Sequence, residues 1–181
     1  MVRRHVLPRS FALAFLIMLC SCERLPEEYP PPEQHPPSPE SASVPVEWML
    51  IDMADPDAPS HFVKDLQAPI NDGWVFTGPS PTLKILAVLT KGLRLRVEFT
   101  LWDVAFRDTG PVQLQFRVNG FQLANVRYDS PGPKVFEQPI PPEDLAAGEE
   151  STVSITIDKP WVSPRNHLQY GFILQRIGFV H

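Results

Sequence analysis

The amino-acid sequence predicts an all-β domain, an antiparallel β-sandwich of the jelly-roll type with about eight strands. Apolar and polar residues alternate in several segments, and this period of two is typical of strands with one face buried and the other in water. Asn119-Gly120 lies between two such segments and is the strongest short signal for a β-hairpin. Pro and Gly separate the segments, which favours short antiparallel strands packed as a sandwich.

The strands are expected, in chain order, at residues 46–52, 82–89, 93–101, 112–118, 121–128, 153–157 and 170–180. In 93–101, Leu, Val and Phe occupy every second position, with Arg, Glu and Thr between them. The last segment is nearly all apolar apart from Gln175 and Arg176, so we expect it to be a central strand. Only Pro142 to Ala147 is expected to be helical, for a turn or two at most.

The N-terminal residues have the composition of a secretory signal. Arg3, Arg4 and Arg9 precede an apolar run from Phe11 to Leu19. This run is about half of the ~20 residues that a membrane-spanning helix needs. We therefore expect a cleaved signal rather than a transmembrane segment.

The sequence Leu19-Cys20-Ser21-Cys22 resembles the lipobox of bacterial lipoproteins: an aliphatic residue, any residue, a small residue and then cysteine. The resemblance implies cleavage after Ser21 and a diacylglycerol thioether on Cys22, usually with a third, amide-linked chain. Two or more acyl chains anchor a protein stably in a membrane. Glu23 follows the cysteine where aspartate commonly causes inner-membrane retention, and this favours the outer membrane of the cell envelope. The alternative is an ordinary signal peptide (residues 1–21) with two incidental cysteines.

Residues 22–45 are predicted to be the lipidated N-terminus and a disordered linker. Prolines such as Pro30-Pro31-Pro32 alternate with glutamates, and almost no apolar side chain is available to offset the entropy of ordering. Polyproline II spans ~3.1 Å per residue, so about 20 residues reach ~60 Å. We expect a spacer between the membrane and residues 46–181, which form one domain with a single core; the alternative is a tail without a function.

Cysteine content and charge exclude several functions. Both cysteines lie in the signal region, so the mature domain has no free thiol, disulfide, thiolate metal site or cysteine nucleophile. The chain has 16 Lys and Arg; without the first three arginines, 13 remain against 21 Asp and Glu, a formal charge of −8. An acidic exported chain without a basic stripe is a poor candidate for binding nucleic acid. We expect no cofactor.

The strand segments also resemble a family of bacterial β-sandwich modules. The segments that carry the resemblance are 93–99, 110–112, 118–120, 157–164 and 170–174. Such modules occur alone on lipoproteins or appended to glycosyltransferases and methyltransferases of surface-polysaccharide assembly, and they are similar to galactose-binding jelly rolls. The resemblance covers residues 74–180. Related modules often have an Asp-x-Arg pair before the last strand, where this chain has Asn166-His167-Leu168-Gln169, so no ligand role carries over.

The loop 158–167 is the best candidate for a binding site. It contains Trp161, Arg165, Asn166 and His167 between two expected strands, and loops on a rigid scaffold often carry function. An exposed Trp face stacks on the apolar side of a sugar ring, while Arg and Asn offer hydrogen bonds to hydroxyl groups. The alternative is that Trp161 packs over the edge of the sandwich and Arg165 pairs with a carboxylate.

Trp102 and Arg107 form a second candidate binding cluster. Trp102 falls on the polar phase of its strand, which indicates exposure or a second packing layer. The segment 108–111, Asp-Thr-Gly-Pro, is typical of a turn. Trp74 follows the turn signal Asn71-Asp72-Gly73 and is expected to fill the core where its strand begins.

Signals for metal binding and catalysis are weak. Asp52, Asp55 and Asp57 could hold a structural Ca²⁺, but Asp-Pro-Asp is also a common turn, and we expect no metal. The histidines lack zinc-ligand spacing, and no nucleophile elbow or phosphate loop is present. The paired Glu143 and Asp144 are typical of a helix start. We therefore expect a protein that is not an enzyme.

The sequence as a whole predicts a lipid-anchored envelope protein with a non-catalytic β-sandwich that binds glycan or another envelope component. One alternative is a structural or assembly lipoprotein that contacts other envelope proteins. A glycan hydrolase is the third hypothesis, because its carboxylates can lie far apart in the sequence. The expected partners are the membrane, through Cys22, and a polysaccharide or an envelope protein.

Overall fold

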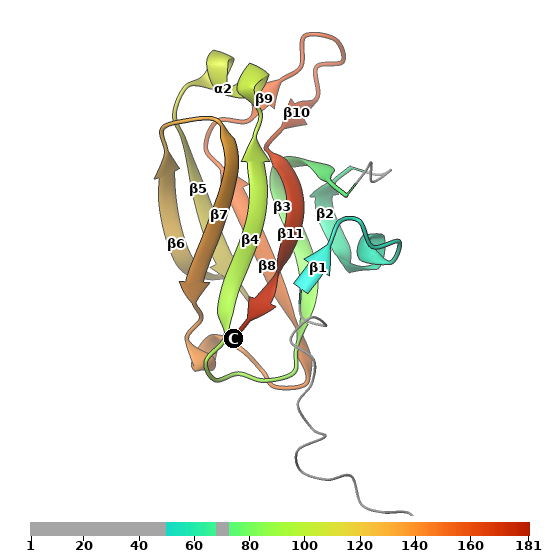
Figure 1. Ribbon diagram of the computed structural model, residues 1–181, viewed down its shortest axis with the longest axis vertical. Coiled ribbons are helices and arrows are strands. Elements are labelled where there is room, and N and C mark those ends of the chain that lie inside the picture. The colour runs from blue at the N-terminus through green and yellow to red at the C-terminus, as the bar shows by residue number, and fades with distance from the viewer. Residues whose placement is uncertain (1–49, 68–72) are drawn as a thin grey trace, which may run out of the picture. The chain divides into compact units, whose positions relative to one another are not determined.

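The computed structural model describes residues 50–67 and 73–181, which form an antiparallel β-sandwich (Figure 1). This confirms the predicted fold class. The predicted signal, Cys22, the linker and the first four residues of strand 46–52 lie outside the described residues. Within the described part of the chain, no helix is long and apolar enough to cross a membrane.

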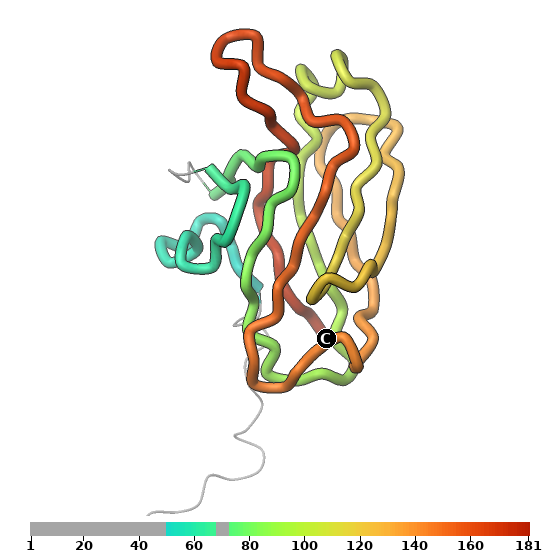
Figure 2. The backbone as a smooth tube through the Cα atoms, turned by 180° about the vertical axis from the view of Figure 1, so that it is seen from behind, coloured from blue at the N-terminus to red at the C-terminus, as the bar shows by residue number. Residues whose placement is uncertain are grey.

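Nine strands form two layers that share one long strand, and β9 and β10 form a separate two-stranded sheet. The strands are β1 (Leu50–Asp52), β2 (Phe62–Leu66), β3 (Val75–Ala87), β4 (Arg94–Leu101), β5 (Val112–Val118), β6 (Phe121–Tyr128), β7 (Gly132–Pro139), β8 (Glu149–Ile157), β9 (Trp161–Val162), β10 (Gln169–Tyr170) and β11 (Ile173–Val180). One layer has the order β1-β11-β4-β7, and the other has the order β2-β3-β8-β5-β6. Figure 1 views the first layer from the front, and Figure 2 views the molecule from behind.

Strand β3 passes from one sheet to the other. Val75 and Phe76 pair with β11, whereas Thr82 to Ala87 pair with β8. The change occurs at Gly78-Pro79-Ser80-Pro81, where prolines remove backbone donors from both ladders. Phe76 is thereby placed at the end of the sandwich where β11 begins.

The core is formed by the inward-facing positions of the alternating strands, as predicted. Leu95, Val97 and Phe99 of β4 are at most 1% exposed. Across the sandwich, Phe116 of β5 and Phe136 of β7 stack in parallel with ring centroids 3.6 Å apart. Strand β11 pairs with β4 on one side and with β3 and β1 on the other, which confirms that it is central.

The Asn119-Gly120 hairpin is also confirmed. Both residues have positive φ angles, 48° and 85°, as a type I′ turn between β5 and β6 requires. Asn119 also ties the turn to its surroundings. Its Nδ2 donates to the Asp144 carbonyl at 2.7 Å, and its Oδ1 accepts from the Thr152 N–H at 2.8 Å.

The structure corrects four expectations. Residues 103–109 form helix α2 (Asp103–Thr109), whereas the sequence predicted only a turn at 108–111. The helix was missed because it is too short to show a helical period in the sequence. A short 3₁₀ turn, η3 (Ala58–His61), was also not predicted. The expected helix at 142–147 is a single 3₁₀ turn, η4 (Pro142–Asp144). Strand β7 was missed because Pro133 and Pro139 interrupt its pattern; it is an edge strand, where proline is tolerated.

Candidate functional site

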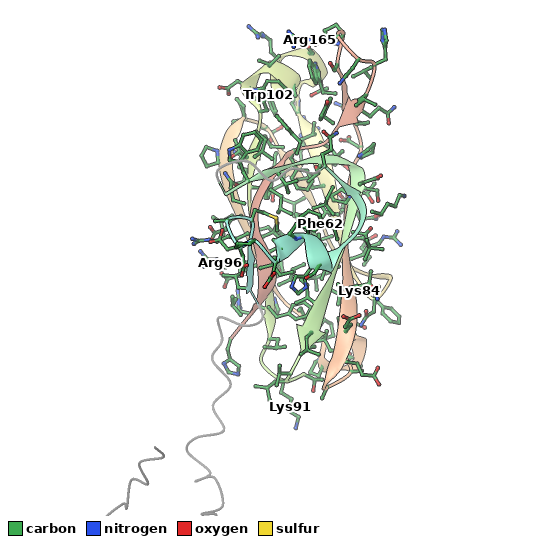
Figure 3. All side chains as sticks on the ribbon, turned by 90° about the vertical axis from the view of Figure 1, so that its right-hand side faces the viewer. Phe62, Lys84, Lys91, Arg96, Trp102 and Arg165 are labelled. Atoms are coloured by element: carbon green, nitrogen blue, oxygen red, sulfur yellow. The ribbon has the colours of Figure 1, made fainter. Side chains whose placement is uncertain are left out.

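The candidate site lies at the end of the sandwich that carries α2 and the β9–β10 hairpin (Figure 1). In this hairpin Trp161 pairs with Tyr170 and Val162 pairs with Gln169. Because side chains alternate along a strand, the two aromatic residues share one face of the hairpin. Figure 3 shows Trp102 and Arg165 at this end and Lys91 at the opposite end.

Gly171 fixes where the hairpin joins the sandwich. Its N–H donates to the Thr77 carbonyl at 2.8 Å, which brings β10 against β3. A Cβ atom at this position would lie 2.5 Å from the Gly78 carbonyl oxygen and 2.8 Å from the Thr77 hydroxyl oxygen. Only glycine fits this approach, and the approach places Tyr170 beside Phe76.

Four aromatic side chains close a circuit at this end of the molecule, and we name them the aromatic box: Phe76, Trp102, Trp161 and Tyr170. Ring centroids are 5.6 Å apart from Phe76 to Trp102, 5.3 Å from Trp102 to Trp161, 6.1 Å from Trp161 to Tyr170 and 5.4 Å from Tyr170 to Phe76. Neighbouring ring planes are inclined by 54°, 78°, 43° and 68° in the same order. The rings are therefore set at angles to one another, like the walls of a box.

All four rings line one groove with a volume of about 470 Å³. The remainder of its lining comes from the loop between β9 and β10, namely Ser163, Pro164, Arg165 and Asn166. Ligand sites in proteins are mostly apolar clefts of about 300–1,000 Å³ with a few polar groups, and this groove matches that description.

Helix α2 holds Trp161 in place. The indole Nε1 donates to Asp108 Oδ2 at 2.7 Å, a short hydrogen bond to a charged acceptor. Asp108 lies in the last turn of α2, which follows β4 directly after Trp102. The helix therefore positions both tryptophans of the box, one through the chain and the other through a side-chain hydrogen bond.

The loop between β9 and β10 is held by its own hydrogen bonds. Asn166 Nδ2 donates to the Tyr170 hydroxyl at 3.1 Å, and Asn166 Oδ1 accepts from the Leu168 N–H at 3.2 Å. His167 has a positive φ of 58°, and its N–H donates to the Ser163 carbonyl at 2.9 Å. These contacts fix the polar wall of the groove beside the aromatic box.

Among the residues that the structure describes, Arg165 is the only formally charged one that lines the groove. Its side chain is exposed, and its guanidinium makes no ion pair or hydrogen bond with any residue that the structure describes. The alternative in which Arg165 pairs with a carboxylate is therefore wrong for the described residues. The groove thus presents one free positive charge on a chain whose formal net charge is −5.

The structure brings together four of the six predicted binding residues: Trp161, Arg165, Asn166 and Trp102 all line the groove. The other two do not line it: His167 is exposed in the loop between β9 and β10, and Arg107 is exposed on α2. Whether the four lining residues bind a ligand stays a prediction.

Sequence reasoning missed Phe76 and Tyr170, and it assigned Asp108 to a turn, whereas the structure places it in α2 with its carboxylate on the Trp161 indole. Phe76 was not singled out, although a strand was expected to begin at Trp74, and Tyr170 was assigned to the apolar last strand. The one available signal was Tyr170-Gly171, an aromatic residue before a glycine at a strand break.

Two other predicted features lie outside the groove. Trp74 is half-buried rather than part of the core, and its ring meets the Phe76 ring edge to face at 5.1 Å. Asp52 Oδ1 accepts from the Ala54 N–H and Asp55 Oδ1 accepts from the Asp57 N–H, so these acids are used in turns. Asp52 Oδ2 pairs with Arg176 at 2.7 Å. Among residues 50–67 and 73–181, no three His, Cys, Asp or Glu side chains are grouped so that they could hold a metal ion.

No protein-family model matches the chain, and no curated protein matches it. Among solved structures, it is similar to a family 35 carbohydrate-binding module from an environmental isolate, with 14% identity, a TM-score of 0.48, and coverage of 73% of this chain and 92% of that chain. It is also similar to a family 35 module from Cellvibrio japonicus, with 12% identity, a TM-score of 0.40, and coverage of 74% and 92%. A third, from Clostridium thermocellum, has 11% identity, a TM-score of 0.35, and coverage of 63% and 85%.

Proposed function

We propose that this chain is a lipid-anchored cell-envelope protein whose β-sandwich is a non-catalytic module that binds glycan in the groove lined by the aromatic box and the loop between β9 and β10. The observation that carries the proposal is the aromatic box with a polar wall beside it. Aromatic side chains and a few fixed polar groups in one open groove are the features of a binding site.

The groove has the two kinds of group that a sugar needs. The C–H face of a pyranose ring is apolar and packs on an indole or phenol ring, and the rings of Trp102, Trp161 and Tyr170 border the groove. The hydroxyl groups of the sugar need donors and acceptors, which Asn166 and Arg165 supply from the wall. Because Asp108 and Tyr170 already fix Trp161 and Asn166, little ordering cost remains for binding.

The anchor is proposed from the sequence alone. Leu19-Cys20-Ser21-Cys22 supports lipidation of Cys22, Glu23 supports the outer membrane, and the proline-rich segment up to residue 45 supports a spacer. Metabolic labelling with an alkynyl fatty acid tests the anchor. We expect label on the full chain and none on the Cys22→Ser variant, with Cys20→Ser as the matched control; equal label on Cys22→Ser would contradict lipidation at this residue.

A second function is favoured by one observation. Val162 and Leu168 on the β9–β10 hairpin are 51% and 50% exposed, and such apolar side chains at a projecting element are typical of protein contacts. An assembly lipoprotein would use this surface. A hydrolase is less favoured, because no carboxylate of residues 50–67 and 73–181 lines the groove.

A glycan array probed with the full chain tests the proposal. The detergent should contain no sugar, so that it does not compete for the groove. We expect the chain to bind a defined set of envelope glycans and the Trp161→Ala variant to lose them. Trp74→Phe is the matched control, because Trp74 lies near the box but does not line the groove. An array without a bound glycan, or binding that survives Trp161→Ala, would refute the glycan module.

A further inference from the structure

The aromatic box has more rings than a single stacked sugar needs. Sugar stacking uses one or two ring faces, whereas here four rings close a circuit with sides of 5.3 to 6.1 Å. Rings that are inclined to their neighbours and border a shared space can turn several faces toward one group. A cation within ≈ 6 Å of ring centroids is attracted by the negative faces of the rings, and quaternary ammonium groups are recognised in this way.

Asp108 increases the attraction of the box for a cation. Its carboxylate accepts the Trp161 indole N–H at 2.7 Å, and this hydrogen bond shifts electron density toward the indole ring. The charge of Asp108 lies behind the wall and not in the groove, because Asp108 is not among the lining residues. The hydrogen bond therefore makes the face of the Trp161 ring more attractive to a cation, although Asp108 is not among the lining residues.

A primary ammonium group fits this box poorly. It is strongly hydrated, and none of the lining side chains in the described part of the chain is an anion that could replace its water. A quaternary ammonium has no N–H to satisfy, and its methyl groups pack on aromatic rings. The chemistry of the box thus favours a quaternary ammonium over a lysine-like amine.

Arg165 supplies a second contact, to an anionic group of the ligand. Its guanidinium is a lining cation without a partner among the described residues, so a lone cationic ligand would be repelled there. A guanidinium binds phosphate through two parallel N–H donors. A ligand with a phosphate next to its quaternary ammonium satisfies Arg165 and the box together.

We propose that the groove recognises a phosphocholine-like group, in which the quaternary ammonium enters the aromatic box and the phosphate pairs with Arg165. This inference rests on the proposed function, since it names the substituent of the glycan that the groove selects. The same headgroup occurs on lipids, so the test separates the two sources.

Calorimetric titration of the full chain in a polyoxyethylene detergent tests the chemistry. The probes are phosphocholine, choline and inorganic phosphate. We expect saturable binding of phosphocholine and at least about tenfold weaker binding of choline and of phosphate, because each alone loses one of the two contacts. Equal affinity for choline and phosphocholine, or no binding of phosphocholine, would overturn the proposal.

Variants test separately the contact of the phosphate with Arg165 and the contact of the ammonium group with the aromatic box. Arg165→Gln should weaken phosphocholine binding by about tenfold, because the phosphate contact is removed, and should strengthen choline binding slightly, because the repulsion of a lone cation is removed as well. Arg107→Gln is the matched control, an exposed arginine at the same end of the molecule that does not line the groove, and should change neither affinity. Trp102→Leu should weaken both ligands. If Arg165→Gln weakened choline and phosphocholine equally, the assigned geometry would be wrong.

A pair of glycans that differ only in a phosphocholine substituent separates this inference from the proposed function. Tighter binding of the substituted glycan supports both. If the chain binds the unsubstituted glycan equally well, the inference fails and the glycan module stands. If neither glycan binds and the Cys22→Ser variant binds phosphatidylcholine vesicles but not phosphatidylglycerol vesicles, the headgroup chemistry stands and the glycan module fails.

Discussion

The two ends of the sandwich differ in what the side chains of Asn119 and Arg165 contact. At the end with the β5–β6 turn, the side-chain amide of Asn119 forms hydrogen bonds with the backbone of Asp144 and Thr152. At the end with the β9–β10 hairpin, the guanidinium of Arg165 has no partner among the described residues, and four aromatic rings border a groove. The comparison teaches that the side chain of Asn119 is used within the fold, whereas the groove end has internal hydrogen bonds of Asp108 and Asn166 and also keeps the Arg165 guanidinium and four aromatic rings available for a ligand.

The close approach of Gly171 to β3 holds the groove end together, and its substitution should have the largest effect. Gly171→Ala places a methyl group against the backbone of Gly78, so we expect a loss of unfolding free energy of about 3 kcal/mol and a loss of glycan binding. Chemical denaturation measures the first and titration the second. Gly148→Ala is the control for loss of a glycine, because its added Cβ meets no atom within 4 Å, although its φ of 76° adds strain. Full stability of Gly171→Ala would show that the hairpin does not depend on this approach.

The end with the β5–β6 turn should affect stability and not binding. Asn119→Ala removes two side-chain hydrogen bonds to backbone and puts alanine at a positive φ, and we expect it to cost about 2 kcal/mol of unfolding free energy. Asn125→Ala is the matched control, since this exposed asparagine makes only one long contact, 3.5 Å to Gln113. Glycan affinity should be equal in both variants and the unchanged chain. A change in affinity upon Asn119→Ala would break the division between the ends.

Asp108 should affect binding more than stability. Asp108→Ala frees the indole of Trp161, and we expect glycan affinity to fall by about fivefold, roughly 1 kcal/mol, with a small change in melting temperature. Asp108→Asn keeps an oxygen that accepts the indole N–H and should retain most of the affinity. If both variants bind like the unchanged chain, Trp161 does not need its hydrogen bond for binding.

The smallest expected effect lies between the two ends, at the ion pair of Asp52 and Arg176. The hydrogen bond from the Ala54 N–H and the pairing with Arg176 lower the pKa of Asp52 below its usual 3.8. A carboxyl whose pKa is lower in the folded state stabilises the fold above its unfolded pKa, and this contribution is lost as pH falls through the folded value. Both side chains are exposed, so the contribution is below about 1 kcal/mol. Denaturation curves of Asp52→Asn and the unchanged chain should therefore converge below about pH 4. Curves that stay equally far apart at all pH values would contradict this origin.

The sequence predicts this fold well where the pattern is local. Alternation in 93–101 and 112–118 gives β4 and β5, and Asn119-Gly120 gives the turn that joins β5 to β6. Helix α2 could not be found in this way, because seven residues make fewer than two turns and have no visible period. The register of β3 on β11, which pairs Phe76 with Ile173, cannot be predicted from the pattern of either segment alone.

The candidate site was predictable only in part for the same reason. Trp161, Arg165 and Asn166 are close in sequence and lie between two strands, so one loop contains them all. Trp102 stood out because it breaks the alternation of its strand. Phe76 and Tyr170 join them only through the sheet register, and His167 was included because loop composition does not reveal where each side chain points.

Tryptophan and asparagine side-chain signals in a ¹H–¹⁵N NMR titration with the glycan selected on the array test the central claim most directly. The account predicts that the indole signals of Trp102 and Trp161 shift along one saturable curve, whereas the side-chain amide signal of Asn119 at the end with the β5–β6 turn stays in place. Saturable binding that shifts Asn119 and leaves both indole signals unchanged would contradict the account, because the ligand would then bind outside the groove.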